Sequence, residues 1–235
     1  AAAALVMEAL QFLTRRDPDA WDALFSTLGG SMAVLLWFSF HTERRSMIVG
    51  AWILCGMLSL VVALPPMLVL ADRVHAHLSF PLLASFEGRS EVGRWWSHAG
   101  RLSRVKAQVT HGEYALRVAL PRARARYPGL FMTDGPRDWS GYRQLCFDLY
   151  LTGGAERSLW VRADDRLGNP AYQDRAQTMV SLVPGANSIC LDLDSFLRTP
   201  EGRPLDQTRV VRWGMFFDAA QGGESFFLDH VRLTR

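Results

Sequence analysis

Charge is missing from one long stretch of the chain. No residue from Ser46 to Ala71 is charged, and Arg45 and Asp72 bound this run. An α-helix rises about 1.5 Å per residue, so about 20 residues cross a bilayer core of roughly 30 Å. The pattern therefore predicts a membrane-spanning helix at about 47–70, in a multi-pass protein of the cell membrane.

Two more apolar segments precede this run. Residues 23–42 carry no formal charge and predict a second spanning helix at about 22–40. Residues 1–13 are mostly apolar and begin without an initiator Met, so we expect the sequence to enter partway through an earlier helix, with further helices upstream. We assign residues 1–71 to a transmembrane helical region and residues 72–83 to a connector.

Beyond the connector the pattern changes to short alternating stretches. They recur about every ten residues, with turn residues such as Gly153-Gly154 between them. This pattern predicts an all-β sandwich or barrel over 84–235. The expected strands are Ala84–Glu87, Trp95–Ala99, Ala107–Thr110, Tyr114–Leu120, Tyr142–Leu151, Ser158–Ala163, Ala176–Leu182, Asn187–Leu193, Val210–Phe217 and Ser225–Leu233.

Alternation assigns side chains to the inner and outer faces of these strands. The expected inward set is Leu145, Phe147, Leu149, Leu151, Leu159, Val161, Ala163, Trp213, Met215 and Phe217. In the last strand, an inward set is possible only if a β-bulge lies near Asp229. The residues of that set are Phe226, Leu228, Val231 and Leu233.

The outward residues mix flat aromatic rings with planar polar groups. They are Asp148, Tyr150, Trp160, Arg162 and Asp164. Sugars stack their C–H faces on aromatic rings and exchange hydrogen bonds with carboxylate and guanidinium groups, so these residues form a candidate glycan-binding site. The alternative is that β-propensity and cross-strand pairing alone place the aromatics there.

A polar cluster marks the loop before the second apolar segment. It comprises Glu8, Gln11, Arg16, Asp19 and Asp22. One interpretation is structural: Glu8 pairs with an arginine, and Asp22 caps the next helix and complements its dipole. The other is a polar site at the membrane surface, where Arg16 binds the anion of a lipid-linked phosphate or glycan.

The same cluster resembles the core signature of the VanZ-like membrane proteins. The matching motifs are Glu8-Ala-Leu-Gln11, Arg16-Asp-Pro-Asp19-Ala-Trp-Asp22 and Thr27-Leu-Gly29, and Ser26 stands where that family usually has Asn. The resemblance covers about residues 5–40 and implies a small helical-bundle membrane protein that lacks its first helices here. It implies no known reaction.

The C-terminal part is similar to the jelly-roll, galactose-binding-like modules, many of which bind carbohydrate. The similarity lies in Phe86-Glu87-Gly88, Trp95, the run 111–118, Asp138-Trp139-Ser140-Gly141-Tyr142, the run 145–148, Pro184-Gly185 and the run 227–233. It implies a jelly-roll sandwich over 84–235. It also implies a structural Ca²⁺ ion held by Glu87 and Asp229, unless Glu87 pairs with an arginine and Asp229 only occupies the bulge.

The net charge, the cysteines and the absence of known catalytic motifs limit the classes of function that the sequence favours. The net charge of +3 does not suggest a nucleic-acid partner. Cys146 and Cys190 lie in two expected strands and could pair, whereas Cys55 lies in the apolar run as a small hydrophobe. Neither a Gly-x-Ser-x-Gly nor a His-Glu-x-x-His motif nor a phosphate loop occurs, so nothing favours a hydrolase.

These observations lead to three hypotheses about function. The first is a non-catalytic protein of the bacterial envelope, anchored in membrane lipid, whose extracytoplasmic sandwich binds a glycan or cell-wall polysaccharide. The second is a VanZ-like membrane enzyme or carrier for a lipid-linked cell-wall precursor. The third is a structural anchor whose sandwich binds protein.

Overall fold

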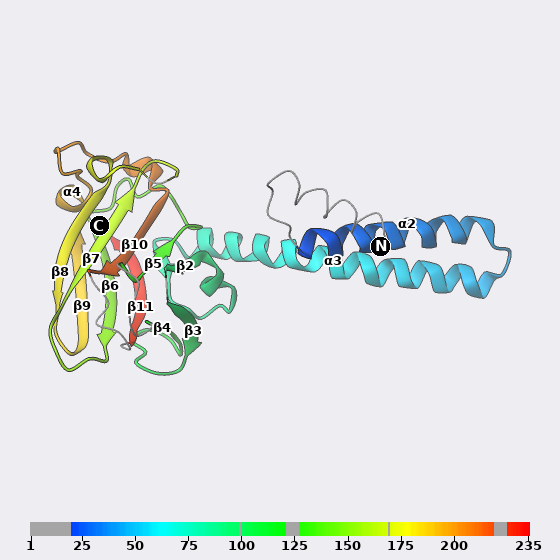
Figure 1. The fold of residues 1–235 in the computed structure, drawn as a ribbon, viewed down its shortest axis with the longest axis horizontal. Coiled ribbons are helices and arrows are strands. Elements are labelled where there is room, and N and C mark those ends of the chain that lie inside the picture. The colour runs from blue at the N-terminus through cyan, green and yellow to red at the C-terminus, as the bar shows by residue number, and fades with distance from the viewer. Residues whose placement is uncertain (1–19, 99, 121–126, 169, 219–224) are drawn as a thin grey trace. The chain divides into compact units, whose positions relative to one another are not determined.

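The computed structural model forms two compact units, Ala1–Leu70 and Ala71–Arg235. The structure describes residues 20–98, 100–120, 127–168, 170–218 and 225–235 (Figure 1). Glu8, Gln11, Arg16 and Asp19 lie outside the described residues, and Asp22 lies in the first turn of a helix without a described side chain. The polar membrane-surface site therefore stays a prediction.

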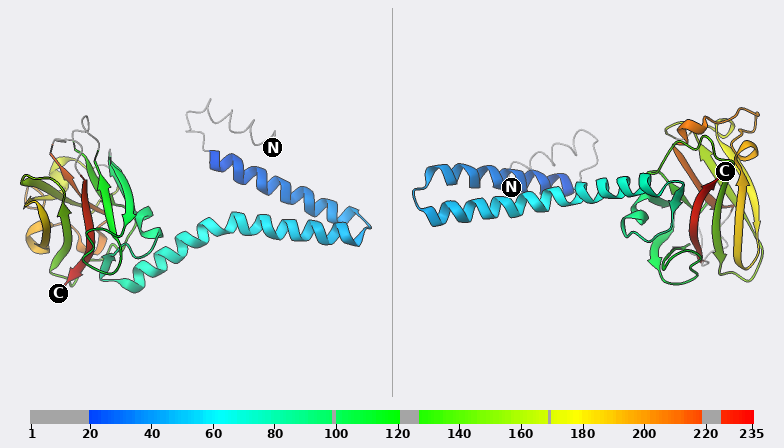
Figure 2. Two further views of the ribbon diagram at one scale, coloured as in Figure 1. Left: turned by 90° about the horizontal axis from the view of Figure 1, so that it is seen from below. Right: turned by 180° about the vertical axis from the view of Figure 1, so that it is seen from behind.

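Two long helices follow one another along the chain, α2 at Ala20–His41 and α3 at Arg45–Ser79. Within the first unit they run side by side in opposite directions (Figure 2), because only three residues separate them. Phe40 of α2 packs edge-on against Trp52 of α3, with ring centroids 6.5 Å apart. Farther along, the Cys55 thiol lies 3.8 Å from the carbonyl oxygen of Met32.

Both helices are long and apolar enough to cross a membrane. Their large apolar side chains are mostly exposed; Val34 and Trp37 of α2 are 65% and 62% exposed, and Leu60 and Met67 of α3 are 63% and 62% exposed. A contiguous exposed apolar surface of this kind is rare on a water-soluble domain. The lengths and composition agree with the two spanning helices that the sequence predicts.

The expected connector is mostly helical, because α3 continues to Ser79. Residues 72–79 contain neither Gly nor Pro, so nothing in their sequence breaks the helix. Pro81 disfavours the helical conformation at the residue before it, and the helix accordingly ends one residue earlier.

The second unit contains two antiparallel β-sheets that pack as a sandwich (Figure 1). Sheet A has the strand order β3-β4-β11-β6-β9, with β1 also paired to β11, and sheet B has the order β2-β5-β10-β7-β8. The strands are β1 Leu82–Ala84, β2 Trp95–His98, β3 Arg101–Val105, β4 Ala115–Ala119, β5 Gly129–Met132, β6 Gln144–Leu151, β7 Arg157–Asp164, β8 Ala176–Leu182, β9 Gly185–Asp192, β10 Arg212–Phe217 and β11 Ser225–Thr234.

Short helical turns lie between the strands. They are η1 Ser90–Arg94, η2 Tyr172–Asp174, α4 Leu193–Phe196 and η3 Gln207–Arg209. The Asp192 side chain caps α4 by accepting hydrogen bonds from the backbone N–H groups of Asp194 and Ser195.

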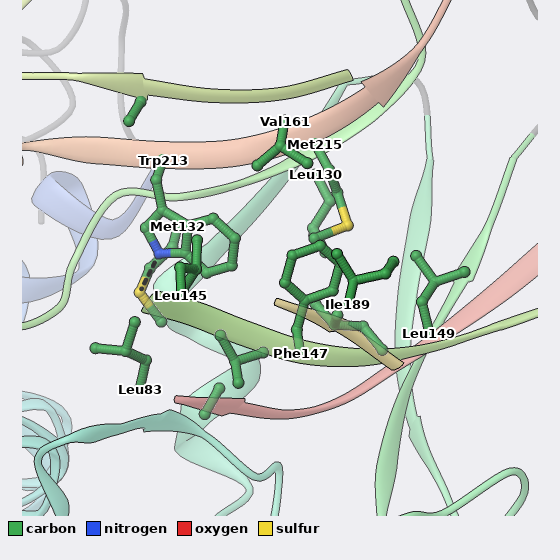
Figure 3. Close-up of a cluster of buried hydrophobic side chains, with 14 of the residues drawn as sticks. Leu83, Leu130, Met132, Leu145, Phe147, Leu149, Val161, Ile189, Trp213 and Met215 are labelled. Carbon is green, nitrogen blue, oxygen red and sulfur yellow. Dashed lines mark hydrogen bonds between the residues drawn. The ribbon is translucent and has the colours of Figure 1, made fainter. Parts of the chain in front are cut away.

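Apolar side chains from both sheets fill the space between them (Figure 3). All the residues that alternation assigned to the inner faces are buried, as predicted. Trp213 of β10 lies among them, and its indole N–H donates a hydrogen bond of 3.4 Å to the sulfur of Met132 on β5. The donor of this large ring is therefore not left unpaired in the core.

A finer prediction about the last strand is also confirmed, and the structure answers whether Cys146 and Cys190 pair, which the sequence left open. The β11·β6 register shifts between Asp229 and Arg232, and His230 has a φ of 49°, so the expected bulge is present. It lets apolar residues point inward on both sides of it. Cys146 of β6 lies directly opposite Cys190 of β9, and the two form a disulfide.

The strand predictions fail at four places. The strand expected at Ala84–Glu87 is displaced, because β1 ends at Ala84. Residues 107–110 form bends and irregular backbone rather than a strand, while β3 and β5 were not expected. β3 escapes sequence analysis because two arginines interrupt its short apolar pattern at an edge of sheet A. β5 is only four residues long and begins with Gly129, a residue type that strands usually disfavour.

Candidate functional site

The five outward residues of the predicted glycan site do not come together. Asp148 and Tyr150 lie on β6 in sheet A, whereas Trp160, Arg162 and Asp164 lie on β7 in sheet B. The chain crosses from one sheet to the other between these strands, so their outer faces point to opposite sides of the sandwich. The prediction of one site containing all five is corrected accordingly.

A groove of about 660 Å³ lies over the outer face of sheet B. Its aromatic lining residues are Trp96, Tyr127, Phe131, Trp160, Tyr172 and Phe216. Its polar lining residues are Arg162, Arg175, Gln177, Arg212 and Asp218. This volume is in the range of small-ligand sites, which are about 300–1,000 Å³, and the lining combines aromatic with charged side chains, so the groove is the candidate site.

Four rings in the groove form a row across neighbouring strands, and we call them the aromatic platform. Trp96 of β2, Phe131 of β5, Phe216 of β10 and Trp160 of β7 follow one another with centroid separations of 6.2, 6.4 and 6.5 Å. The angles between successive planes are 34°, 23° and 13°. Successive rings thus pack against one another, and together they form an apolar row along the groove.

Two glycines make room for the platform. A Cβ atom added to Gly129 would lie 2.5 Å from the Cβ atom of Phe216, and one added to Gly214 would lie 2.5 Å from Cδ1 of Phe131. Each glycine faces one of these aromatic residues across a strand pair. Side chains at the two positions would push the rings out of the row, so glycine is needed there.

Sequence analysis missed most of the platform, although part of the signal was available. Because Trp213, Met215 and Phe217 point inward, the alternation in β10 leaves Phe216 on the outside. The outward position of Phe131 follows only once β5 is recognised as a strand. The pairing of Phe216 with Trp160 joins residues that lie far apart in the sequence.

Asp164 is buried at one end of the groove and binds two arginines. It is 0% exposed, and it accepts hydrogen bonds from Nε of Arg162 at 2.9 Å and from Nε of Arg212 at 2.7 Å. Both carboxylate oxygens are thus occupied by guanidinium groups. Asp164 orients these arginines and does not face a ligand, contrary to the prediction that it hydrogen-bonds a sugar.

The outer face of sheet A is organised differently. Asp148 accepts a hydrogen bond of 2.7 Å from the hydroxyl of Ser188, and it lies 3.6 Å from Nδ1 of His230. Tyr150 packs edge-on against Phe227 at 78°. These polar and aromatic groups contact one another and form no row of parallel rings.

Two carboxylates hold one loop in place beside this face. Glu87 accepts hydrogen bonds of 2.9 Å from the N–H groups of Glu113 and Tyr114. Asp229 accepts from the N–H groups of Thr110 and His111 at 2.7 and 2.9 Å. Both carboxylates therefore bind backbone donors of the segment 110–114.

This arrangement does not fit a calcium ion as it stands. Calcium takes six to eight oxygen ligands, whereas one oxygen of Glu87 and both oxygens of Asp229 accept hydrogen bonds from N–H donors. Among the described residues, no group of three or more His, Cys, Asp or Glu side chains is placed to hold a metal. Calcium at this point stays a prediction that would need further oxygen ligands.

Comparison with solved structures identifies the fold of the sandwich. An exo-β-agarase matches with a TM-score of 0.53 and 16% identity, over 65% of this chain and 24% of the agarase. The family 11 carbohydrate-binding module from Clostridium thermocellum, solved with a β-1,3-1,4-mixed-linked tetrasaccharide, matches with a TM-score of 0.50 and 18% identity. That match covers 65% of this chain and 94% of the module.

These likenesses show that the second unit shares the β-sandwich fold of a carbohydrate-binding module. The chain spans only about a quarter of the agarase, whose activity is therefore no guide to this protein. No protein-family model matches the chain, and no curated protein sequence matches it. The resemblance of the first unit to VanZ-like proteins thus stays a prediction.

Proposed function

We propose that the sandwich binds a glycan chain in the groove of sheet B without catalysing a reaction, and that α2 and α3 anchor it in a membrane. The observation that carries the proposal is the aromatic platform with guanidinium groups beside it. Aromatic faces stack on the C–H faces of sugar rings, and guanidinium groups donate to ring substituents.

The length of the platform favours an oligosaccharide over a single sugar. Its rings come from four neighbouring strands of sheet B, β2, β5, β10 and β7. Neighbouring strands lie about 4.8 Å apart, so the platform extends about 14 Å across the sheet. Several consecutive sugar units can lie along a surface of this length.

The carboxylates of the groove favour binding over hydrolysis. Glycosidases generally place two carboxyl groups on either side of the scissile bond. Among the described lining residues, Asp218 is the only carboxylate, and the neighbouring Asp164 is buried with both oxygens bound to arginine. The groove thus lacks such a pair within the described part of the chain.

The disulfide supports a location outside the cytoplasm for the sandwich. Cys146 and Cys190 pair across β6 and β9, and disulfides persist mainly in oxidising compartments. Together with the two membrane-length helices, this favours a sandwich held at the outer side of a cell membrane. Protease protection in intact cells tests this orientation. Digestion of the sandwich by protease added outside the cells would support it.

A glycan array with the full chain in detergent tests the proposed binding. Trp160→Ala and Phe216→Ala should each weaken binding about fivefold or more, because a stacked aromatic contributes roughly 1 kcal/mol or more. The matched control is Tyr150→Ala on the outer face of sheet A, which should bind like the native chain. Unchanged binding in both platform variants, or the same loss in the control, would contradict the proposed site.

Failure of glycan binding would leave the two other hypotheses. A protein-binding sandwich would then be favoured by capture of a defined protein partner that Trp160→Ala abolishes. A role in handling a lipid-linked cell-wall precursor would be favoured if Arg16→Ala abolished antibiotic tolerance in a chain that still folds and inserts.

A further inference from the structure

Positive charge exceeds negative charge at one end of the groove. Three arginines line the groove there, Arg162, Arg175 and Arg212, and two of them, Arg162 and Arg212, share the single carboxylate of Asp164. Burial lowers the pKa of Arg162, and although Asp164 raises it, the charges of Arg175 and Arg212 lower it further. The lowered pKa of Arg162 thus reflects its burial first, and the two neighbouring cations add to this effect.

The nearby carboxylates do not offset this excess. Asp165 is held by Arg203, whose Nη1 lies 2.6 Å from it, and Asp174 is held by Arg166 at 3.1 Å. Asp218 lines the groove but follows the far end of β10, six residues from Arg212 and so about 20 Å away at about 3.3 Å per residue.

The arginine cluster also contains donors without acceptors. Arg162 is only 7% exposed, yet its Nη2 atom is buried with no hydrogen-bond partner. The Nε atom of Arg175 is buried without a partner as well. Leaving a buried donor unpaired is costly, more so when the group is charged, so these atoms favour a ligand that supplies acceptor oxygens.

We propose that the groove is specific for an anionic glycan, whose carboxylate or sulfate group binds to Arg162, Arg175 and Arg212 while a sugar ring stacks on Trp160. This inference rests on the proposed function and specifies its ligand class. The planar guanidinium group suits both oxyanions, since it donates two parallel hydrogen bonds to them.

The spacing of Trp160 and Arg162 along β7 allows one ligand to stack on the ring and also reach the guanidinium group. Trp160 and Arg162 point to the same side of the strand and are two residues apart, about 7 Å at about 3.3 Å per residue. Arg162 also lies opposite Gln177 of β8, whose amide can donate to or accept from a neighbouring hydroxyl. A charged substituent of a stacked sugar thus falls within reach of the arginines.

Matched oligosaccharides test the charge preference. The full chain in detergent is titrated with β-1,4-linked hexamannuronate and with β-1,4-linked mannohexaose, which share a backbone and differ in the carboxylate. A second pair, κ-carrageenan hexasaccharide and its desulfated form, tests sulfate. At least one charged member should bind about tenfold tighter than its neutral counterpart, as expected for charge-assisted hydrogen bonds.

Arg175→Gln tests the role of the arginine cluster without removing a partner of Asp164. This variant should lose most of the preference for the charged member, so that the ratio between the two affinities falls toward one. The matched control is Arg117→Gln, which removes the same charge from an exposed position on β4 of sheet A. Raising the salt concentration should weaken binding of the charged member alone, because salt screens exposed charges.

The possible outcomes separate this proposal from the proposed function. Equal affinities within both pairs, with binding that Trp160→Ala abolishes, would overturn the anionic specificity and leave glycan binding intact. A preference for charge that Arg117→Gln reduces as much as Arg175→Gln would also overturn it. Absence of binding to all four oligosaccharides would overturn both proposals.

Discussion

The two outer faces of the sandwich begin from similar sequence patterns and end as different surfaces. Each face carries an aromatic residue with acidic or basic neighbours on a central strand, Tyr150 on β6 and Trp160 on β7. Tyr150 meets Phe227 edge-on at 78°, whereas Trp160 lies at 13° to Phe216. The residues on the neighbouring strands therefore decide whether an outward aromatic becomes part of a platform.

The acidic residues of the two faces differ as well. Asp164 in sheet B is 0% exposed and bound to two arginines, while Asp148 in sheet A is partly exposed and bonds to a serine. On sheet B the carboxylate fixes cations that remain available to a ligand. On sheet A the polar groups satisfy one another.

The largest contrast in stability is expected from removing these charges. Asp164→Asn leaves two arginines beside a neutral amide, and breaking a buried ion pair in this way typically costs about 3–5 kcal/mol. Asp148→Asn should cost only about 1 kcal/mol, the value of one ordinary hydrogen bond. Chemical denaturation of the full chain in detergent, followed by tryptophan fluorescence, measures both.

If both variants lost the same free energy of unfolding, the burial of Asp164 would not make its ion pairs more important for stability than the hydrogen bond of Asp148. A smaller loss for Asp164→Asn than for Asp148→Asn would contradict the assignment of Asp164 as the group that orients Arg162 and Arg212.

The disulfide should stabilise the sandwich without affecting the groove. Replacing both Cys146 and Cys190 by alanine should lower the free energy of unfolding by about 2–4 kcal/mol, since the cross-link restricts the unfolded chain. The disulfide joins β6 and β9 in sheet A, so glycan affinity at sheet B should stay unchanged below the unfolding transition.

Cys55→Ala is the matched control, because Cys55 is the free cysteine and lies in α3. A loss of glycan affinity in the disulfide variant, measured where it is still folded, would show that the two faces are coupled through the core.

Glycine at position 214 should matter for both the fold and the platform. In Gly214→Ala the new Cβ atom would lie 2.7 Å from the Cα atom of Phe131, so backbone must shift, at about 1–3 kcal/mol for such overpacking. Both the free energy of unfolding and the affinity for the glycan should therefore decrease in this variant. Gly154→Ala is the control, because nothing lies within 4 Å of its added Cβ, and it should leave both unchanged.

The main elements of this fold can be predicted from the sequence because each depends on local pattern. Uncharged runs locate α2 and α3, and alternation separates inner from outer residues in β6, β7 and β10. The bulge at Asp229 follows from the same periodicity, whereas the disulfide depends on β6 and β9 being neighbours, which the sequence left open. The similarity of the sequence to jelly-roll modules implies a β-sandwich, and the structural comparison supports this fold.

The site could not be predicted in the same way because it depends on which strands are neighbours. Period-two alternation says that Asp148 and Trp160 both point outward, but it does not say that β6 and β7 lie in different sheets. Arg212 reaches Asp164 across 48 residues of sequence, so the burial of Asp164 has no local signal. The platform likewise needs β5, which sequence analysis missed.

The smallest expected effect is a pH dependence confined to sheet A. Burial lowers the pKa of His230, and the charges of Arg232 and His111 lower it further, although Asp148 and Asp229 act in the opposite direction. The unfolded chain therefore binds a proton more readily than the folded one as the pH falls below about 6.5. Stability should accordingly decrease on acidification from pH 7 toward 5.

His230→Asn should make this decrease smaller, because asparagine does not titrate and tolerates the positive φ at this position. Denaturation at pH 7 and pH 5 compares the native chain with the variant, and the difference should be below about 1 kcal/mol for one partly buried histidine. Glycan binding at sheet B should show no change that depends on His230. An identical pH dependence in both proteins would assign the acid sensitivity to other groups and remove His230 from the comparison of the two faces.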